Sequence, residues 1–333
     1  GRLVQVHNLP RNYLGTLDTA RNLVKTQNTE AVKLLYGNVP DTLSQLIRTA
    51  FVPSPGNIFL VADFSAIEAR VIAWLAGEAW RQEVFATHGK IYEASAASMF
   101  GVPVEKIKKG NPEYALRQKG KIAELALGYG GSSGALIQMG ALKMGLTEDE
   151  LPEIVHRWRK ANKRIIDLWY GLENAALLTM RTGRQSACKN IMFARETDYK
   201  HDFLTVKLPG GRKLYYVSPF LAPNRWGNES VHYYGLNKKN NWGILDTYGG
   251  KLTENIVQAI ARDCLAISIQ NLEAEGYKIV MHVHDEVIID HPLNCDPESA
   301  LKDVCDIMGK SITWAPGLLL KAEGFSHQYY KKE

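Results

Sequence analysis

A buried strand runs into a helix within the stretch IFLVADFSAIEAR, residues 58–70. Residues 58–62 form a short, continuous apolar run, which is typical of a buried strand. Ser65 and Glu68 have the spacing of a capping box, and apolar residues follow at helical spacing. The pattern therefore predicts that Asp63 lies where the strand ends and a helix is about to begin.

A second carboxylate has the same kind of position near the other end of the chain. Residues 278–284 and 287–289 are rich in β-branched residues and predict two strands, with Asp285 and Glu286 as the tight connection between them. A long helix is expected before them, over about 253–275, because an apolar stripe there ends at Gly276.

The segments between these two sites are mostly helical. Asn111 and Pro112 predict the start of a helix that runs to about Leu127, and 148–180 has the pattern of further helix. Residues 205–217 predict a hairpin around a Pro-Gly-Gly turn. This order of elements favours an α+β fold with an antiparallel sheet and a helical insertion over a doubly wound parallel sheet.

Composition narrows the class of protein. The chain has 333 residues, 45% hydrophobic and 23% charged, which is the balance of an ordinary globular protein. Its net charge of +5 is compatible with a polyanionic partner. The four cysteines lack metal-binding spacing, which fits a reducing compartment, and no run of 18 apolar residues occurs. We therefore expect a cytoplasmic protein and no membrane association.

Asp63 and Asp285 lie 222 positions apart, so only the fold can bring them together. Two carboxylates at adjacent strand ends repel each other, and a divalent cation removes that cost. Magnesium prefers oxygen ligands and is held by one or two carboxylates plus substrate phosphates. The alternative is that both aspartates are ordinary turn or cap residues, and Glu68 has the same alternative within its capping box.

A stripe of side chains recurs every four residues along the helix that ends near Leu127. Arg117, Lys121, Leu125 and Tyr129 fall on one gently drifting face, since four residues advance a helix by little more than one turn. Such a stripe offers cations for a triphosphate and a flat ring for a base. The alternative is a solvated cationic face with Tyr129 packed at its end.

Three of these segments together resemble DNA polymerase family A, the DNA polymerase I type, and in particular its phage-encoded branch. Residues 63–70 are similar to the first acidic motif, D-[YF]-S-x-I-E-x-R, and 283–286 to the second, V-H-D-E. Arg117, Lys121 and Tyr129 with Gly130 are similar to the motif of the fingers helix. Residues 1–10 and 47–53 also fit, so the resemblance covers nearly the whole chain.

The resemblance implies a metal site and a nucleotide site. Asp63 and Asp285 would hold two Mg²⁺ ions, for which Mn²⁺ is a possible substitute, with help from the Phe64 carbonyl and further acidic support from Glu286. The ions would serve phosphoryl transfer.

Arg117 and Lys121 would grip the triphosphate of an incoming dNTP, with Lys121 as general acid. Glu68 would be the steric gate against a ribose 2′-hydroxyl, and Tyr129 would lie near the nascent base pair.

Contacts with primer-template DNA follow from the same resemblance. His284 would lie by the primer terminus, and Arg2 would reach the primer's minor groove. Where many relatives carry Gln on the long palm helix, this chain has Glu254, followed by Asn255.

Two positions depart from the family pattern. Leu125 stands where an aromatic residue is usual, which affects the handling of the sugar 3′ position. Tyr92 stands where a His commonly contacts the triphosphate.

The resemblance also predicts a right-hand polymerase core without a thumb. We expect palm at 1–67, fingers at 68–202 and the second part of the palm at 203–333, with a hairpin insertion at 203–248. The chain begins at the palm, so a thumb, and often an exonuclease domain, would come from a missing part or a separate subunit.

The sequence therefore predicts a template-directed DNA polymerase that extends a primer 3′-hydroxyl with dNTPs and releases pyrophosphate. One alternative is the core of a single-subunit phage-type RNA polymerase, against which Glu68 argues. The other is a non-catalytic DNA-binding relic, against which Asp63, Lys121 and Asp285 argue together.

Overall fold

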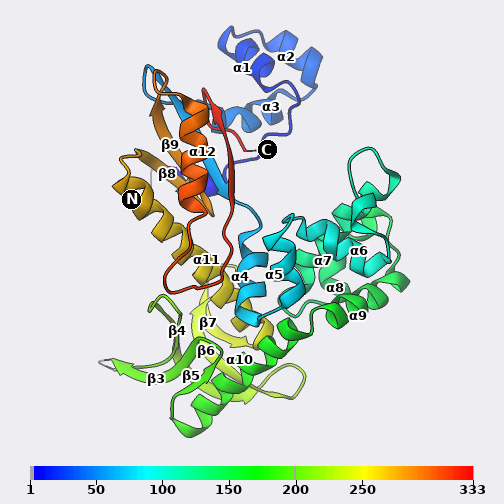
Figure 1. The fold of residues 1–333 in the computed structure, drawn as a ribbon, viewed down its shortest axis with the longest axis vertical. Coiled ribbons are helices and arrows are strands. Elements are labelled where there is room, and N and C mark those ends of the chain that lie inside the picture. Colours follow the sequence, from blue (N-terminus) through cyan, green and yellow to red (C-terminus); the bar gives the residue numbers. More distant parts are fainter. Residues whose placement is uncertain (1–3, 199, 333) are drawn as a thin grey trace. The chain divides into compact units, whose positions relative to one another are not determined.

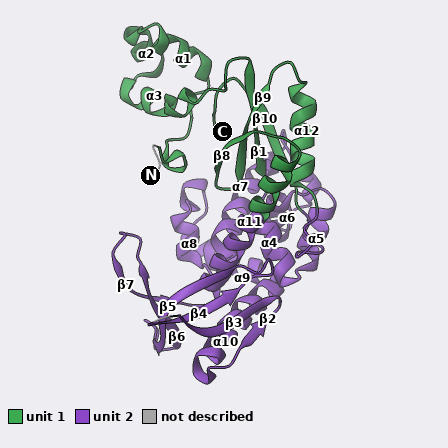
Figure 2. Ribbon diagram, turned by 90° about the vertical axis from the view of Figure 1, so that its left-hand side faces the viewer, with its two compact units in different colours: residues 1–65, 264–310, 320–333 green, residues 66–263, 311–319 purple. Residues whose placement is uncertain are grey.

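A computed structural model describes residues 4–198 and 200–332 (Figure 1). Arg2, the predicted minor-groove contact, lies outside the described residues. The chain divides into two compact units, which Figure 2 colours separately. Unit 1 comprises residues 1–65, 264–310 and 320–333, and unit 2 comprises residues 66–263 and 311–319. The two units are described one at a time below.

Unit 1 is built on a four-stranded antiparallel sheet with the strand order β10-β1-β9-β8. Its strands are β1 (Asn57–Phe64), β8 (Ile279–Val283), β9 (Glu286–Pro292) and β10 (Ala322–His327). Helix α12 (Pro297–Met308) packs on β1 and β10 (Figure 1). Phe59, Val61, Ile288 and Tyr330 form a buried cluster, which anchors the two central strands.

Three short helices of unit 1 precede this sheet in the chain: α1 (Leu17–Lys25), α2 (Thr29–Tyr36) and α3 (Val39–Leu46). Asn28 and Asn38 cap the last two, each accepting a backbone N–H at 3.0 Å. Such caps satisfy amide donors that a helix start would otherwise leave without a partner.

Unit 2 begins with a helical region. Its helices are α4 (Ile67–Ala76), α5 (Ala79–Ala86), α6 (Ile91–Phe100), α7 (Ala115–Leu127), α8 (Ser133–Gln138), α9 (Leu151–Ala161) and α10 (Lys163–Thr182). Helices α6 and α7 approach closely at Gly120, where an added Cβ would lie 2.1 Å from the Tyr92 carbonyl oxygen. Only glycine allows this backbone contact, which fixes how α7 lies on α6.

The second sheet of the chain also lies in unit 2. Six strands follow one another in simple antiparallel order: β2 (Ser186–Cys188), β3 (Ile191–Asp198), β4 (His201–Lys207), β5 (Lys213–Pro223), β6 (Glu229–Leu236) and β7 (Trp242–Thr247). Helix α10 packs against β2, β3, β5 and β6. Phe193, Leu204 and Val206 are fully buried in this sheet.

The long helix α11 (Gly249–Ala274) begins in unit 2 and ends in unit 1. The shorter 3-10 turns are Val6–Asn8, Ile47–Ala50, Val104–Lys106, Pro112–Tyr114, Leu142–Met144 and Glu148–Glu150. Within the described ranges, no helix has both the length and the apolar character needed to cross a bilayer.

The α+β class with antiparallel sheets and many helices is confirmed. The predicted strands around Asp63 and Asp285, the helix ending at Leu127 and the long helix after Gly249 are all present. The hairpin of 205–217 is β4 and β5, but it is only the centre of a larger sheet.

The capping box at Ser65 and Glu68 is wrong. Ala66 is the N-cap of α4, with a left-handed backbone (φ 53°), and no side chain caps the helix. The Ser65 N–H donates to the Lys321 carbonyl at 2.8 Å, so the chain enters the helix through a contact with another strand segment. Glu68 is thereby left available for a different partner.

Candidate functional site

Unit 1 brings Asp63 and Asp285 together, as the sequence predicted. Strands β1 and β9 pair so that Asp63 lies opposite Glu286, next to Asp285 in the two-residue turn between β8 and β9. The Phe64 N–H donates to the Asp285 carbonyl at 3.4 Å, which ties this turn to the end of β1. The carboxyl groups of the two aspartates are close enough for the charge of Asp285 to act on Asp63.

The environment of Asp63 opposes its ionisation. Burial, followed by the charge of Asp285 and a smaller contribution from Glu286, raises the pKa of Asp63 from 3.8 to about 7. Lys332 acts in the opposite direction, but more weakly than burial and Asp285. A carboxyl group with this pKa is held half-protonated near neutral pH, and a nearby cation would restore its charge.

The donors present fit a divalent cation. Asp63 Oδ1 is buried and has no hydrogen-bond partner among the described residues. Mg²⁺ and Mn²⁺ prefer oxygen ligands, and carboxylates in particular. A carboxylate oxygen without a partner, next to a second carboxylate, matches that preference. No group of three or more His, Cys, Asp and Glu side chains converges within residues 4–198 and 200–332, so further ligands would be backbone, water or substrate oxygens.

Glu286 belongs to a buried polar network behind the aspartates. It accepts the Tyr330 hydroxyl at 2.7 Å, and the Arg48 guanidinium lies 3.4 Å from the same hydroxyl. Lys332 Nζ is 3.8 Å from the second oxygen of Glu286. Burial raises the pKa of Glu286, while its hydrogen bond and these cations oppose the rise. Glu286 is thus oriented toward the interior of the network.

Arg48 anchors this network to the N-terminal segment. Its guanidinium donates to the carbonyls of Pro10 at 2.7 Å and Leu9 at 2.5 Å, and the residue is 3% exposed. A buried guanidinium that is hydrogen-bonded to backbone carbonyls has a fixed position, so it can orient the side chains next to it. Through Tyr330 and Glu286, Arg48 therefore connects the N-terminal segment to the β8–β9 turn.

His284 occupies the first position of that turn, with a left-handed backbone (φ 56°). A residue without glycine's freedom pays a conformational cost there, which the surrounding structure must offset. Its exposed ring meets His7 edge-on, with centroids 6.3 Å apart. The predicted neighbour of the primer terminus is therefore accessible and beside Asp285.

In unit 2, the stripe on α7 is accessible along its length. Arg117, Lys121 and Tyr129 are partly exposed, and Leu125 is 46% exposed. Arg117 donates to Glu93 Oε1 at 2.9 Å, and the cations of Arg117 and Lys121 lie 5.5 and 5.9 Å from the Tyr92 ring centroid. The structure thus brings together the Tyr92, Arg117 and Lys121 side chains named from sequence.

A buried network on the other side of α7 fixes which face is outward. Glu124 pairs with Arg81 and accepts from Ser95 and from the Trp158 ring nitrogen, the last at 3.0 Å. Burial lowers the pKa of Arg81 to about 9. Breaking a buried ion pair would leave an uncompensated charge, so the pair keeps the Glu124 side of α7 facing the interior.

Tyr129 joins α7 to α4. Its hydroxyl donates to Glu68 Oε2 at 2.5 Å, and burial followed by the charge of Glu68 raises the pKa of Tyr129. Glu254 on α11 is close enough to contribute to the same effect. Glu254 itself accepts from Lys251 at 2.8 Å. Glu68 is therefore a paired residue of the site and not a cap.

Asn255 has an evident structural partner. Its side-chain amide donates to the hydroxyl of the buried Tyr216 at 3.0 Å, and burial raises the pKa of that tyrosine to about 12. The amide oxygen is not used in this bond. A DNA contact from Asn255 stays a prediction, as does that of Glu254.

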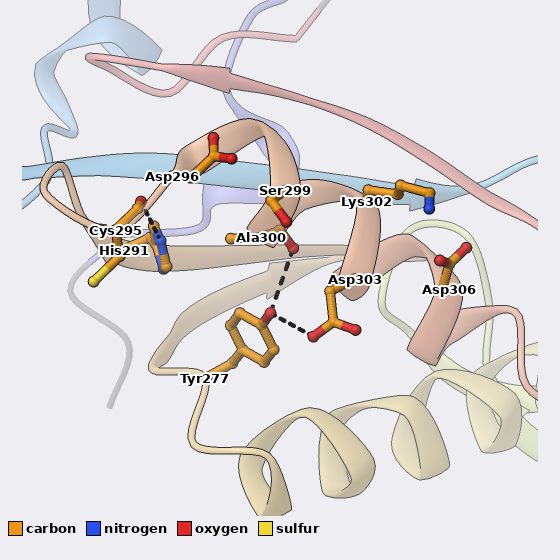
Figure 3. Close-up of a pocket in the computed structure, with 9 residues that line it drawn as sticks. All are labelled: Tyr277, His291, Cys295, Asp296, Ser299, Ala300, Lys302, Asp303 and Asp306. Atoms are coloured by element: carbon orange, nitrogen blue, oxygen red, sulfur yellow. Dashed lines mark hydrogen bonds between the residues drawn. The ribbon is translucent and has the colours of Figure 1, made fainter.

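A separate open pocket of about 450 Å³ lies in unit 1 beside α12 (Figure 3). Hydrogen bonds join some of its lining residues to one another. Tyr277 donates to Asp303 at 2.7 Å, and His291 Nε2 donates to the Cys295 carbonyl at 2.9 Å. Neither Asp63 nor Asp285 lines it.

Sequence reasoning missed Tyr330, Lys332 and Glu93. Each acts on a predicted site residue from a distant position in the chain. The run of two tyrosines and two lysines at 329–332 has no spacing that distinguishes it from a solvated tail. Glu93 sits next to Tyr92, but its pairing with Arg117 depends on the close packing of α6 and α7.

Comparison with known proteins identifies the family. The model of DNA polymerase family A matches residues 31–196. A DNA polymerase of Bacillus phage SP02 is 58% identical over this whole chain, which covers 50% of the phage protein. The thermostable DNA polymerase I of Thermus aquaticus is 23% identical over 77% of this chain and 25% of its own length. The chain thus spans about half the length of the phage relative.

The fold agrees with this relationship. The polymerase domain of Pol1 from M. smegmatis, solved with a DNA primer-template and a dNTP, matches 86% of this chain and 42% of its own. The TM-score is 0.57 at 19% sequence identity, a likeness of fold. The whole-chain identity to a phage polymerase, the family motif segments and this shared fold agree: the chain belongs to DNA polymerase family A.

Proposed function

We propose that this chain is the catalytic portion of a template-directed DNA polymerase. It would extend a primer 3′-hydroxyl with dNTPs on primer-template DNA and release pyrophosphate. The observation that carries the proposal is the meeting of Asp63 and Asp285, 222 positions apart, at the end of two paired strands.

The two aspartates would hold two Mg²⁺ ions, or Mn²⁺ in their place. When bound, such ions activate an attacking oxygen and stabilise a leaving one. Asp63 supplies the orphaned oxygen, and Phe64 is the proposed source of a carbonyl ligand. The Glu286, Tyr330 and Arg48 network keeps the turn that carries Asp285 in place.

We assign the sheet of unit 1 to the palm and the helices of unit 2 to the fingers. The boundaries predicted from sequence were palm 1–67, fingers 68–202 and palm 203–333. Unit 2 also includes residues 203–263. The contacts within the chain therefore group the six-stranded sheet with the helices of unit 2. A thumb and an exonuclease from another part of the protein or another chain stay part of the proposal.

Arg117 and Lys121 would bind the dNTP triphosphate from the accessible face of α7. Arg117 now pairs with Glu93, and a triphosphate would compete for that guanidinium with a higher charge. Lys121 Nζ would donate a proton to the pyrophosphate as it leaves. Tyr92 lies beside both cations and would orient them, and Leu125 would cover the sugar with an apolar surface.

Glu68 would disfavour ribonucleotides. The Tyr129 hydroxyl holds its carboxylate at 2.5 Å, so the group cannot easily swing aside for a 2′-hydroxyl. His284, Glu254 and Asn255 would contact the primer-template. A cytoplasmic location follows from the proposed role.

The proposal is tested with Asp285→Asn, which keeps the shape and removes the charge. Primer extension on a gel should fall at least about 1000-fold, because a lost metal ligand costs several kcal/mol of transition-state stabilisation. Binding of primer-template duplex should change little. The matched control is Asp306→Asn, an exposed carboxylate of the same unit, which should extend normally.

Three other results would decide for a rival or against the site. Equal or preferential use of rNTPs by the wild type would favour an RNA polymerase. A wild type that binds DNA but never extends a primer with Mg²⁺ or Mn²⁺ would favour a relic. Normal extension by Asp285→Asn would remove the aspartate pair from the mechanism.

A further inference from the structure

One face of the six-stranded sheet in unit 2 carries exposed aromatic and aliphatic side chains where the other face is buried. We use the term aromatic face for the surface formed by Tyr215, Phe220, Tyr234, Leu236, Trp242 and Ile244. Each of these side chains is at least 36% exposed, and Leu236 and Trp242 are each 61% exposed. Monomeric proteins rarely leave such contiguous apolar surface uncovered without a use for it.

Strand register places these residues on one side. Tyr234 lies opposite Val217 on β5 and opposite Ile244 on β7, and Leu236 lies opposite Trp242. Residues two apart in a strand share a face, so Tyr215 is on the same side as Val217. The opposite side is represented by Leu204, Tyr216 and Val231, which are at most 4% exposed.

A β-bulge adds Phe220 to the aromatic face. The register of β5 and β6 shifts between Val217 and Phe220, and Ser218 in the bulge has a φ of 45°. Bulges re-aim side chains along a strand. The Phe220 ring consequently stacks on His232 at 5.4 Å and approaches Tyr234 at 6.4 Å. The bulge therefore places three rings next to one another on this face.

The same segment carries few acidic residues and so has a positive net charge. Residues 203–248 contain six Lys and Arg against two Asp and Glu, a net charge of +4. The segment also holds nine of the 31 aromatic residues in 46 positions. Glu196, the acidic group beside the aromatic face on β3, is bonded to Lys213 at 2.7 Å. Asp246 is exposed on β7 opposite His232.

The turn between β6 and β7 presents two of these cations in a defined shape. Asn237 accepts the N–H groups of Lys239 at 2.9 Å and Asn241 at 3.1 Å through its side chain. Asn240 adopts the left-handed conformation that such turns require. Lys238 and Lys239 are exposed at this end of the aromatic face, in the hairpin of the purple unit labelled β7 in Figure 2.

We propose that the aromatic face binds single-stranded DNA, with bases stacked on its rings and phosphates near Lys238 and Lys239. Stacking platforms next to positive charge bind single strands with little sequence preference, since every base has a π-face. An apolar protein partner would not account for the exposed Lys238 and Lys239 at the end of this face. The inference rests on the proposed function for the identity of the ligand, and it adds a binding surface beyond the family match at 31–196.

The test measures binding of a fluorescent single-stranded oligo-dT by anisotropy, in the Asp285→Asn background so that no synthesis intervenes. Trp242→Ala and Tyr234→Ala should each weaken binding about 5-fold or more, the usual loss for one stacking ring. The control is Tyr170→Ala on α10, an exposed aromatic (62%) that is not part of the aromatic face, which should bind as the parent does.

Salt dependence tests the charge contribution independently of the rings. The double variant Lys238→Ala/Lys239→Ala should reduce the slope of log affinity against log salt by about 1.4, since each phosphate contact with a single strand contributes about 0.7. Lys302→Ala/Lys310→Ala removes two exposed lysines from unit 1 and should leave the slope unchanged. If a ring variant misfolds, the lysine variants still test the inference, because they change only exposed side chains.

The outcomes separate this inference from the proposed function. Unchanged oligo-dT affinity and slope in all aromatic-face variants would overturn the inference, even if the wild type extends primers. Ring-dependent binding by a chain that never extends a primer would support the inference and count against the polymerase. A dimer that dissociates in Trp242→Ala, with oligo-dT binding unaffected, would show that a second copy covers the face and would overturn it.

Discussion

The pKa of Asp63 makes a quantitative prediction about stability without metal. Its folded-state value of about 7 lies above the ordinary 3.8, so the folded protein binds this proton more tightly than the unfolded chain does. Stability from this group is therefore full below about pH 4 and is lost as the pH rises toward 7. A shift of about three units corresponds to about 4 kcal/mol, and to about half of that after allowance for water at the partly exposed side chain.

The perturbation that isolates this effect is Asp63→Asn. Urea unfolding in EDTA at several pH values between 4 and 8 gives the unfolding free energy of wild type and variant. The wild type should lose about 2 kcal/mol more than Asp63→Asn over this range. Asp285→Asn should show an intermediate loss, because it removes the second cause of the shift and leaves burial in place.

Magnesium should reverse the effect in the wild type alone. A cation that binds only the folded state adds about 2.7 kcal/mol at one hundred times its dissociation constant. At pH 8 this gain should be absent in Asp63→Asn. Parallel pH profiles for wild type and Asp63→Asn would refute the account, because the two carboxyl groups would then not share one buried environment.

Three further predictions concern unit 2. In single-nucleotide kinetics, Glu68→Ala should raise the ratio of rNTP to dNTP incorporation at least about 10-fold if Glu68 is the steric gate. Tyr129→Phe should raise this ratio less, because it removes only the hydrogen bond that holds the Glu68 carboxylate. Arg117→Ala should raise the KM for dNTP, whereas a change in kcat alone would place Arg117 outside triphosphate binding. Gly120→Ala should destabilise the protein by about 1–3 kcal/mol in urea unfolding, because its Cβ would strike a carbonyl of α6, while Gly134→Ala in α8 meets nothing within 4 Å and should be neutral.

Local pattern was sufficient wherever an element is defined by its own residues. The apolar run before Asp63, the Asn111–Pro112 helix start and the Gly276 stop lie close to the observed element ends. The capping box failed because a tertiary contact, from Ser65 to Lys321, sets the backbone at that point. The sheet beyond β4 and β5 was missed because its remaining strands alternate weakly and expose apolar residues on their open side.

The sequence by itself determined which residues are chemically able to act: the two strand-end aspartates, the cationic stripe of α7 and the family to which they point. The tertiary structure alone decided which carboxyl groups meet and how far the surroundings shift the pKa of each. Burial and the neighbouring charge of Asp285 raise the pKa of Asp63, and the hydroxyl of Tyr129 holds Glu68. Charge interactions fall off with distance and depend on the surrounding water, and neither quantity is written in the spacing of residues along a chain.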